Sequence, residues 1–459
     1  MSGEDTIAAI ATAHGEGGIS IVRLSGARSL ALAERVIRCP KPPLAERPTN
    51  TIVHGYVTDQ GRDVDEVLIL IMRAPHSYTG EDVVEIQGHG GHVSARRILR
   101  CVLQAGARSA EPGEFTRRAF LNGRLDLVQA EAVLDLVRSS SDRAADMALQ
   151  QLEGRLSDAF NSIYDGLMAA AADLAAALDF PEEDEHPQLI DRPLALLHKV
   201  SDKIDQLAAT WNEGRVIRNG ALVVIFGGAN VGKSTLLNTL LEYDRAIVSP
   251  IPGTTRDFIE EPFCLNGIPI RLVDTAGIRH TESELEREGI RRAEDVIAKA
   301  DLHLYVMDAS RPLSEQDVAN LTIRKPGKCV VVLNKSDLGV QITPEDLQGY
   351  DAAVTSLIEK KGLCDVRSLM DKKLIAGMKS GPADTDTPVA ISERHHDLLV
   401  KAQADVKDAL AVLNEKHDEA PFLASEKLQS AAESIALIIG RSYRESLVDE
   451  IFSRFCIGK

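Results

Sequence analysis

Apolar residues recur three and four positions apart through the second quarter of this 459-residue chain, a spacing that predicts helices with one buried face. One stripe consists of Leu149, Leu152, Leu156, Phe160, Ile163 and Leu167. A second stripe consists of Leu194, Leu197, Ile204, Leu207 and Trp211. Between the stripes, residues 179–188 contain two prolines and five acidic residues, which oppose a continuous helix. Residues from about 120 to 215 are therefore predicted to be helical almost throughout.

The first 119 residues show a different pattern. Short runs with β-type composition alternate with turn residues at 6–12, 17–26, 51–57 and 65–74. Residues 30–37 and 93–106 have helical spacing instead. This mixture predicts an α+β domain.

The most specific motif follows an apolar, strand-like run at 221–226. Residues 227–234, GGANVGKS, match G-x-x-x-x-G-K-[ST], and an amphipathic helix pattern starts directly after them. Small residues let successive backbone N–H groups curl around a phosphate, and the following helix directs its positive end at the same anion. Lys233 is then expected to bridge the β- and γ-phosphates, and Ser234 to hold Mg²⁺. Glycine-rich turns also occur without a ligand, but the order strand, loop, helix favours a nucleotide site.

Two further segments suit the Mg²⁺ ion and the γ-phosphate of a nucleoside triphosphate. Residues 268–277 read as a strand that ends in Asp274, expected to hold Mg²⁺ through water, and in Gly277, whose N–H can contact the γ-phosphate. Residues 253–257, GTTRD, offer Thr255 as a Mg²⁺ ligand while the γ-phosphate is present. The segments therefore predict a nucleotide-dependent switch.

A fourth segment, NKSD at 334–337, follows an apolar strand pattern and indicates the base. The Asp337 carboxylate can accept two hydrogen bonds, from the guanine N1–H and from the 2-amino group. Adenine offers no matching pair of donors, so Asp337 favours GTP over ATP. NKSD alone is typical of a turn, and the order and spacing of all four segments carry the prediction.

Charge limits the nucleic-acid interpretation. The chain carries 52 Lys+Arg and 69 Asp+Glu, a net charge of −17, and an acidic surface repels phosphates at long range. A nucleic-acid partner therefore needs a local basic patch, and one segment has seven arginines against Glu111 and Glu114. The alternative interpretation of this segment is a solvated helix face. The arginines are Arg96, Arg97, Arg100, Arg108, Arg117, Arg118 and Arg124.

Cysteine usage and hydropathy point to an ordinary globular protein. The six cysteines include no CxxC pair, which argues against a zinc site and a disulfide framework. No apolar stretch approaches the roughly 18 residues of a membrane span, and the acidic start does not resemble a signal peptide. We therefore expect a cytoplasmic protein with no membrane association.

Pattern changes divide the chain into four segments. We expect an α+β domain at 1–119, a first helical part at 120–215, a nucleotide-binding domain at 216–380 and a second helical part at 381–459. Residues 377–388 have linker composition, and Ser392 is placed to cap a new helix. The economical architecture inserts the nucleotide-binding domain into a helical domain built from both flanks.

The four nucleotide motifs resemble the TrmE-Era-EngA-like family of GTPases, and other residues narrow the resemblance to its tRNA uridine-modifying members. The most specific segments outside the nucleotide motifs are 77–91 (SYTGEDVVEIQGHGG), 112–133 and 455–459 (FCIGK). The resemblance covers nearly the whole chain. It implies a multidomain α/β and α+β fold: a folate-binding and dimerising α+β domain, an all-α domain, and an inserted Ras-like GTPase domain with a mostly parallel sheet and helices on both faces.

The resemblance also implies an activity and partners. With an FAD-dependent partner, MnmG, such a GTPase adds an aminomethyl or carboxymethylaminomethyl group to carbon 5 of the tRNA wobble uridine. The resemblance implies methylene-tetrahydrofolate as the carbon source and a tetrahydrofolate cofactor, in its 5,10-methylene or 5-formyl form. A homodimer, a heterotetramer with MnmG, and K⁺-dependent hydrolysis activated by dimerisation of the GTPase domains are implied as well. FAD is expected in the partner, because this chain has no G-x-G-x-x-G fingerprint.

Site residues follow by motif. Glu286 matches the general base, acting through a bridging water, and the folate-binding residues are Arg23, Glu81, Arg124 and Lys459. Mg²⁺ is held by Ser234 and Thr255. The resemblance implies that K⁺ is held by the side chain of Asn230 and the carbonyl groups of Ser249, Ile251 and Thr254. Cys456 is a candidate for the modification chemistry, or else a structural thiol. The GTP-binding residues are Asn230, Val231, Gly232, Lys233, Ser234, Thr235, Ser249, Pro250, Ile251, Pro252, Gly253, Thr254, Thr255, Asp274, Thr275, Ala276, Gly277, Asn334, Lys335, Asp337, Ser356, Leu357 and Ile358.

Several positions depart from the expected pattern. Ile278 stands where Ras-like enzymes have the glutamine that orients the attacking water, so another group must take that role. Pro250 and Pro252 restrict the loop expected to hold K⁺, Leu357 replaces an alanine, and Arg124 replaces a lysine. Glu81 has the alternative interpretation of a turn carboxylate. A regulatory switch GTPase in ribosome assembly, and a folate-dependent methyltransferase with a vestigial GTPase domain, are the alternative functions.

Overall fold

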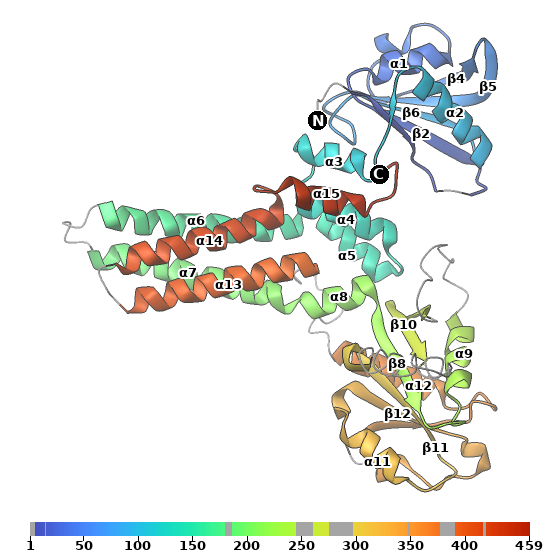
Figure 1. Cartoon of the computed structure of the whole chain (residues 1–459), viewed down its shortest axis with the longest axis vertical. Coiled ribbons are helices and arrows are strands. Elements are labelled where there is room, and N and C mark those ends of the chain that lie inside the picture. Colours follow the sequence, from blue (N-terminus) through green and yellow to red (C-terminus); the bar gives the residue numbers. More distant parts are fainter. Residues whose placement is uncertain are drawn as a thin grey trace, which may run out of the picture. The chain divides into compact units, whose positions relative to one another are not determined.

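The computed structural model describes residues 5–13, 15–179, 186–244, 260–274, 297–347, 349–376, 391–415 and 419–459. They divide into two compact units. The first comprises Met1–Leu134, Gln151–Leu196 and Asp408–Lys459, and the second comprises Asp135–Gln150 and Leu197–Lys407. Segments from both ends of the chain therefore fold together in the first unit (Figure 1).

A seven-stranded sheet forms the centre of the N-terminal part of the first unit, in the order β3-β4-β5-β6-β2-β1-β7. Neighbouring strands are antiparallel except β1 and β7, which are parallel. The strands are β1 (Ile7–Ile10), β2 (Ile19–Ser25), β3 (Ile37–Arg38), β4 (Thr51–Asp59), β5 (Arg62–Met72), β6 (Val83–His89) and β7 (Arg108–Ser109).

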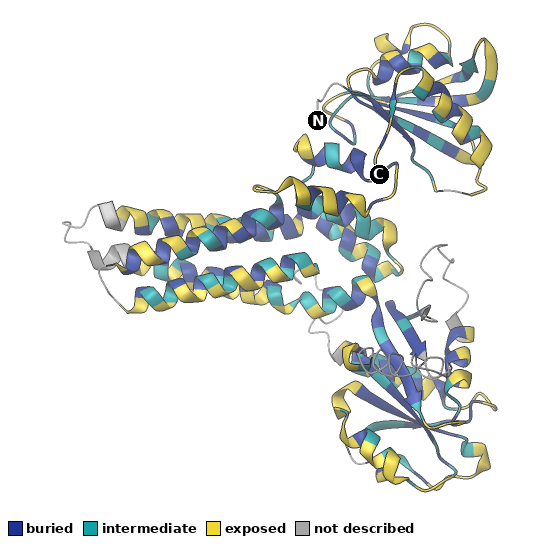
Figure 2. Cartoon of the chain, viewed as in Figure 1, coloured by how far each residue is buried: buried dark blue, intermediate teal, exposed yellow. Residues whose placement is uncertain are grey.

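Alternation along these strands directs one set of side chains into a core. Val22, Leu24, Ile69, Val84 and Ile86 are buried in one cluster with residues of α1 (Ser29–Val36) and α2 (His92–Gln104). Because successive strand residues point to opposite faces, this pattern buries one face of the sheet under the two helices. Figure 2 shows the buried residues along the strands.

Helices from distant parts of the chain complete the first unit. Phe120 of α3 (Glu114–Leu121) packs with Leu127 at the start of α4 (Leu127–Arg138) and with Phe452 of α15 (Glu445–Ser453). The long helix α6 (Arg155–Asp179) lies along α14 (Ala420–Ile439), with small and aliphatic residues buried at helical spacing on both. The helix α7 (His186–Ala209) begins in the first unit and continues in the second.

The first apolar stripe corresponds to two helices. Helix α5 (Asp142–Leu152) ends before Gly154, which has a φ of +97° and interrupts the helical path, and α6 starts at Arg155. The stripe residues Leu156, Phe160, Ile163 and Leu167 are buried as predicted, whereas Leu149 on α5 is 46% exposed. The prediction that Leu149 belongs to the same buried helix face was therefore wrong, because the break at Gly154 separates it from α6.

A six-stranded sheet forms the centre of the second unit, in the order β13-β12-β11-β8-β10-β9. Only β9 and β10 are antiparallel among its neighbouring strands. The strands are β8 (Ala221–Gly227), β9 (Glu260–Leu265), β10 (Ile268–Asp274), β11 (Leu302–Asp308), β12 (Cys329–Asn334) and β13 (Asp351–Val354).

Both faces of this sheet carry a core, as continuous apolar strands require. Val223 and Ile225 of β8 are buried with residues of α9 (Lys233–Asp244) and α12 (Leu363–Ala376). Phe226 belongs to a second cluster that includes Leu321 of α11 (Glu315–Thr322). Among the described residues, the remaining helices are α8 (Trp211–Asn219) and α13 (Glu393–Asn414), and short 3₁₀ turns occur at Leu44–Glu46, Pro326–Lys328, Ser336–Leu338 and Pro344–Asp346.

The expected fold class is confirmed: an α+β part, long helices, and a mostly parallel sheet with helices on both faces. The Ser392 cap is confirmed too, because its Oγ accepts a hydrogen bond from the His395 N–H at 3.3 Å. The division into two units does not test the four predicted segment boundaries, which stay predictions. The predicted linker at 377–388 lies outside the described residues.

Candidate functional site

The phosphate-loop motif connects β8 to α9 at the carboxyl edge of the parallel sheet. Gly227 has a φ of +151°, and a Cβ there would lie 2.2 Å from the carbonyl oxygen of Val306. Only glycine fits this position. Lys233, the first residue of α9, donates from Nζ to the carbonyl oxygen of Gly228 at 2.6 Å. Ser234 follows in the first turn, where backbone N–H groups have no partner within the helix and suit a phosphate.

The tip of the loop carries the other predicted residues of this segment. Asn230 is exposed and has a φ of +58°, in the left-handed region, and Thr235 is exposed on α9. Gly232 has a φ of +105°, and a Cβ there would lie 2.3 Å from Nδ2 of Asn334. The loop therefore packs directly against the segment that is predicted to bind the base.

Asn334 connects three of the predicted segments. Its side chain is buried, and its Nδ2 donates to the carbonyl oxygen of Val231 at 2.9 Å. Its Oδ1 accepts from the Leu357 N–H at 3.2 Å and from Thr355 Oγ1 at 3.3 Å. One amide thus joins the phosphate loop to both base-binding segments, which explains why asparagine is needed at the end of β12.

The carboxylate expected to read guanine is held from one side. Ser356, which is buried, donates from Oγ to Oδ1 of Asp337 at 2.7 Å. Asp337 itself is exposed, so its carboxylate can still accept hydrogen bonds from a base. Leu357 is buried, whereas the Ile358 side chain is 82% exposed. The arrangement suits recognition through a carboxylate and backbone N–H groups.

Other predicted site residues lie outside the described residues. These are Ser249, Pro250, Ile251, Pro252, Gly253, Thr254, Thr255, Thr275, Ala276, Gly277 and Glu286, together with Ile278 and the side chain of Asp274. Their roles stay predictions.

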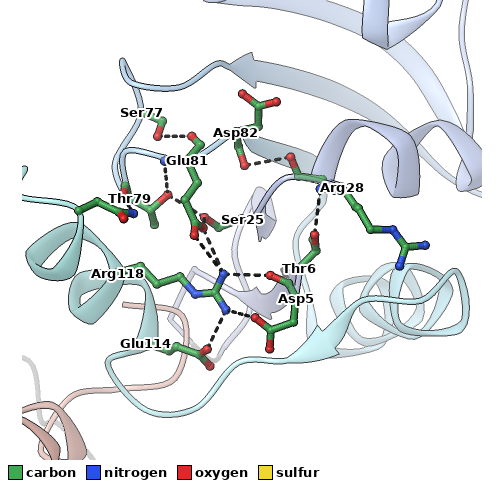
Figure 3. A network of polar contacts seen from close by, with 12 residues as sticks. Asp5, Thr6, Ser25, Arg28, Ser77, Thr79, Glu81, Asp82, Glu114 and Arg118 are labelled. Atoms are coloured by element: carbon green, nitrogen blue, oxygen red, sulfur yellow. Dashed lines mark hydrogen bonds and ion pairs between the residues drawn. The ribbon is translucent and has the colours of Figure 1, made fainter. Parts of the chain in front are cut away.

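In the first unit, the predicted folate residue Glu81 belongs to a polar network (Figure 3). Its carboxylate accepts from Ser25 Oγ at 2.7 Å and from Arg118 at 3.2 and 3.3 Å. Arg118 also donates to Asp5 at 2.7 Å and to Glu114 at 3.0 Å. Arg108 bonds to Asp5 and Glu114 as well. Three carboxylates thus face two guanidinium groups, which leaves one negative charge in excess.

The network fixes the protonation of its buried members. Burial alone would raise the pKa of Glu114, but hydrogen bonds from Arg108, from the Glu111 N–H and from Arg118 outweigh it and lower the pKa. Burial would lower the pKa of Arg118, and its carboxylate partners raise it instead. The Glu81 side chain is 20% exposed, more than Glu114 at 7% or Arg118 at 12%. Glu81 is therefore the member of this trio that is most open to a ligand.

The other predicted folate residues gather around two aromatic rings. The Arg23 guanidinium lies 5.2 Å from the ring centre of Tyr78 and 5.6 Å from that of Phe115, and it bonds to Glu85 at 2.8 Å. Arg124 lies 5.6 Å from the same Tyr78 ring and donates to the Tyr78 carbonyl oxygen at 3.2 Å. Cation–π contacts of this kind hold both guanidinium groups near one ring.

The tail of the chain reaches the same neighbourhood. The Phe115 N–H donates to the main-chain oxygen of Lys459 at 3.2 Å, and the Gly113 N–H to that of Cys456 at 3.4 Å. Gly458 packs against β1, where a Cβ would lie 2.2 Å from the carbonyl oxygen of Ile10. The structure thus brings Arg23, Glu81, Arg124 and Lys459 together, while the Cys456 side chain is exposed. The roles of these residues stay predictions.

Sequence reasoning missed the residues that support this site. Glu81 and the two arginines are held by Arg118, Ser25, Tyr78 and Glu85. None of the four was predicted in this role, and Arg118 was expected only in a basic patch. A signal was present for Glu85, since it lies opposite Arg23 in the β2–β6 register. Pairing Glu85 with Arg23 requires strand β6, and the sequence pattern did not predict that strand.

The predicted basic patch is divided by ion pairs. Arg108 and Arg118 bond to the carboxylates described above, and Arg117 bonds to Asp449 at 3.0 Å. The remaining arginines of helix α2 are exposed; they are Arg96, Arg97 and Arg100. The seven arginines therefore do not act as one free basic surface. Among the described residues, no helix is long and apolar enough to cross a membrane.

Comparisons with known proteins agree along the whole chain. The family described as the GTP-binding protein TrmE N-terminus matches residues 6–124, and the family described as the MnmE helical domain matches residues 127–456. The tRNA modification GTPase MnmE of Geobacter metallireducens is 44% identical over 460 residues, covering 99% of both chains. That of Geobacillus kaustophilus is 42% identical over 468 residues, covering 100% of both.

The chain is also similar to a third MnmE protein and, in part, to one solved structure. The tRNA modification GTPase MnmE of Bacillus subtilis is 41% identical over 468 residues, covering 99% of this chain and 100% of the relative. The G domain of the T. maritima FeoB iron transporter covers 34% of this chain and 98% of its own, at 26% identity and a TM-score of 0.26, which is too weak to add to the assignment. On the identity and coverage of its relatives, the chain belongs to the MnmE family of tRNA modification GTPases.

Proposed function

We propose that this chain hydrolyses GTP and takes part in modifying the wobble uridine of tRNA. With an FAD-dependent MnmG partner, it adds an aminomethyl or carboxymethylaminomethyl group to carbon 5 of that base, using a tetrahydrofolate one-carbon unit. The proposal rests on family membership over the full length, combined with the convergence of the phosphate loop and both base-binding segments on Asn334.

The GTPase half of the proposal assigns roles to this chain's residues. Backbone N–H groups at the start of α9 and the Lys233 ammonium bind the phosphates, and Asp337 accepts hydrogen bonds from guanine. Ser234, in the first turn of α9, and Thr255 hold Mg²⁺, which neutralises phosphate charge when bound. Asn230 is exposed at the loop tip, which suits an amide ligand for K⁺ beside the carbonyl groups of Ser249, Ile251 and Thr254.

Hydrolysis then needs a group that orients water. Glu286 takes this role in the proposal, because Ile278 cannot. When bound beside Asn230, K⁺ would neutralise charge on the phosphates, and two GTPase domains would pair at this loop. The chain would accordingly form a homodimer and a heterotetramer with MnmG. GTP hydrolysis makes no carbon bond, and it therefore drives a conformational cycle rather than the modification itself.

The folate half rests on the polar network of the first unit. A carboxylate offers about four lone-pair positions. Ser25 and Arg118 use some of those of Glu81, and a pterin amino-amide edge can use the rest. Arg23, Arg124 and Lys459 supply cations for the folate carboxylates. All four residues belong to the first unit, so tetrahydrofolate binds there and needs no nucleotide in the second unit.

Mass spectrometry of tRNA wobble nucleosides tests the function. A strain that lacks this chain should lose the carbon-5 modification, and the wild-type chain should restore it. Glu81→Gln should restore it poorly. Arg28→Ala should restore it fully, because Arg28 is exposed and joins the network of Figure 3 only through its backbone N–H, which the change keeps. An unchanged set of wobble nucleosides in the deletion strain would remove the proposed function and favour a switch GTPase.

A further inference from the structure

One ion pair beside the guanine site has no role in the mechanism above. Lys335, the second residue of NKSD, donates from Nζ to Oδ2 of Asp308 at 2.8 Å. Asp308 is the last residue of β11, and it lies beside Asn334, the last residue of β12, in the parallel register. The lysine side chain therefore reaches from β12 to the neighbouring strand, along the edge of the sheet where the nucleotide motifs lie.

Asp308 is itself held in place. Its other oxygen, Oδ1, accepts from the Ser310 N–H at 3.1 Å and from Ser310 Oγ at 2.6 Å. The Asp308 side chain is 11% exposed. Burial would raise its pKa, but hydrogen bonds from Lys335 and Ser310 outweigh burial and lower it, so the carboxylate stays ionised. The other cation nearby, Arg311, is 3.7 Å away and 79% exposed, which makes it a weak competitor for Asp308.

The backbone at Lys335 adds a second constraint. Lys335 has a φ of +67°, in the left-handed region, and Asp337 follows two residues later. Asp337 is exposed and must keep its carboxylate available for the base. An unpaired ammonium two residues away would be attracted to that carboxylate. The pair with Asp308 directs the ammonium to β11 instead.

We propose that Asp308 is a positioning residue for guanine recognition: it holds Lys335 extended along the sheet edge before the nucleotide arrives, and it keeps the ammonium away from Asp337. This inference rests on the proposed binding of GTP. Its effect is on affinity, because a preordered lysine loses less conformational freedom on binding. Within the part of the chain that the structure describes, the side-chain partners of Asp308 are Lys335, Ser310 and Arg311, and they include neither Lys233 nor Ser234 of the phosphate loop. We therefore expect the effect on binding rather than on hydrolysis.

The test measures affinity for GDP and GTP by calorimetry on the full chain, in Mg²⁺ and K⁺. Asp308→Asn should weaken both nucleotides equally, by about three- to tenfold, the scale of ordering one long side chain. At saturating GTP, kcat should stay at the wild-type value while KM rises. Asp308→Glu should recover part of the affinity, because it keeps the charge.

A double-mutant cycle separates positioning from a general loss of stability. If Asp308 acts through Lys335, then Asp308→Asn should weaken binding less in a Lys335→Ala background than in the wild type. The matched control is Asp351→Asn, which removes an ion pair with Lys373 at 2.6 Å. Asp351 is the first residue of β13, so it lies at the amino end of the parallel strands, whereas the nucleotide motifs lie at their carboxyl end. This control should bind GDP as the wild type does.

The outcomes are distinct. Wild-type affinity in Asp308→Asn, or additive losses in the cycle, would overturn the inference and leave the proposed function intact. A wild-type chain that binds neither GDP nor GTP would overturn the proposed function, and the inference with it. Loss in Asp308→Asn with recovery in Asp308→Glu and no change in Asp351→Asn would support it.

Discussion

In the nucleotide site, neutral groups hold the loops and the carboxylate that reads the base: a buried asparagine amide holds the loops, and the Ser356 hydroxyl holds Asp337. The ion pair between Lys335 and Asp308 lies beside them and directs its charges away from Asp337. In the N-terminal site of the other unit, ion pairs hold the corresponding residues, since Arg118 alone bonds to three carboxylates. Neutral supports leave the Asp337 charge available for its ligand. The ion pairs instead fix a set of charges before any ligand arrives, so their loss should affect both stability and binding.

The largest expected effect concerns hydrolysis. Glu286→Ala should bind GTP and pair its GTPase domains in K⁺, yet cleave GTP about 10² to 10⁴ times more slowly, because only water orientation is lost. Single-turnover cleavage in KCl and in NaCl measures this, and wild-type turnover should be much faster in KCl. Equal wild-type turnover in the two salts, or full activity in Glu286→Ala, would contradict the assignment.

Base specificity should respond next. Asp337→Asn removes the acceptor pair for the guanine N1–H and 2-amino group, and each lost charged hydrogen bond costs roughly 1.5 to 3 kcal/mol. We expect weaker GTP binding and a relative gain for xanthosine triphosphate. A nucleotide titration on the variant and the wild type measures both, and an unchanged GTP affinity would remove Asp337 from the site.

The ion-pair network should make the first unit sensitive to acid. The lowered pKa of Glu114 means that its contribution to stability is fully present above the usual value of 4.5, and is lost as the pH falls through the folded-state pKa. Glu114→Gln should therefore lower the free energy of unfolding by about 1 to 3 kcal/mol at pH 7. The difference from the wild type should shrink below pH ~4.

Hydrogen exchange of the β1 amides measures this local effect. Arg28→Ala is the matched control, because its side chain lies outside the network (Figure 3). A difference between Glu114→Gln and the wild type that persists unchanged in acid would mean that packing, rather than the ion pairs, stabilises the first unit.

The nucleotide motifs could be recognised in the sequence because each is a short continuous segment at the end of a strand. The glycines and the Asn-Lys-Ser-Asp run carry their chemistry within four to eight residues. The N-terminal network has no such signal: Arg118 lies 113 residues from Asp5 and 37 from Glu81 in the sequence. Pairing across such distances depends on the sheet register, which patterning alone does not determine.

The same limit applies to the fold. Strands with clear alternation, such as β4 and β5, and the long helices were predicted. The break at Gly154 was not predicted, because the apolar spacing continues across it and the glycine was not used as a helix-end signal. Strand β6 was missed because its glycine and polar residues reduce the β-type pattern, although its valines and isoleucine are buried.

If ion pairs hold the N-terminal site in place before any ligand arrives, that site should bind folate without a nucleotide. Calorimetric titration of 5-formyl-tetrahydrofolate into the nucleotide-free full chain measures this, with Arg23→Ala, Glu81→Gln and the control Arg28→Ala. We predict that the wild type and the control bind alike, and that the two site variants lose about tenfold or more, the scale of one charged hydrogen bond. Equal binding by all four proteins, or binding only when GTP is present, would contradict a preformed folate site.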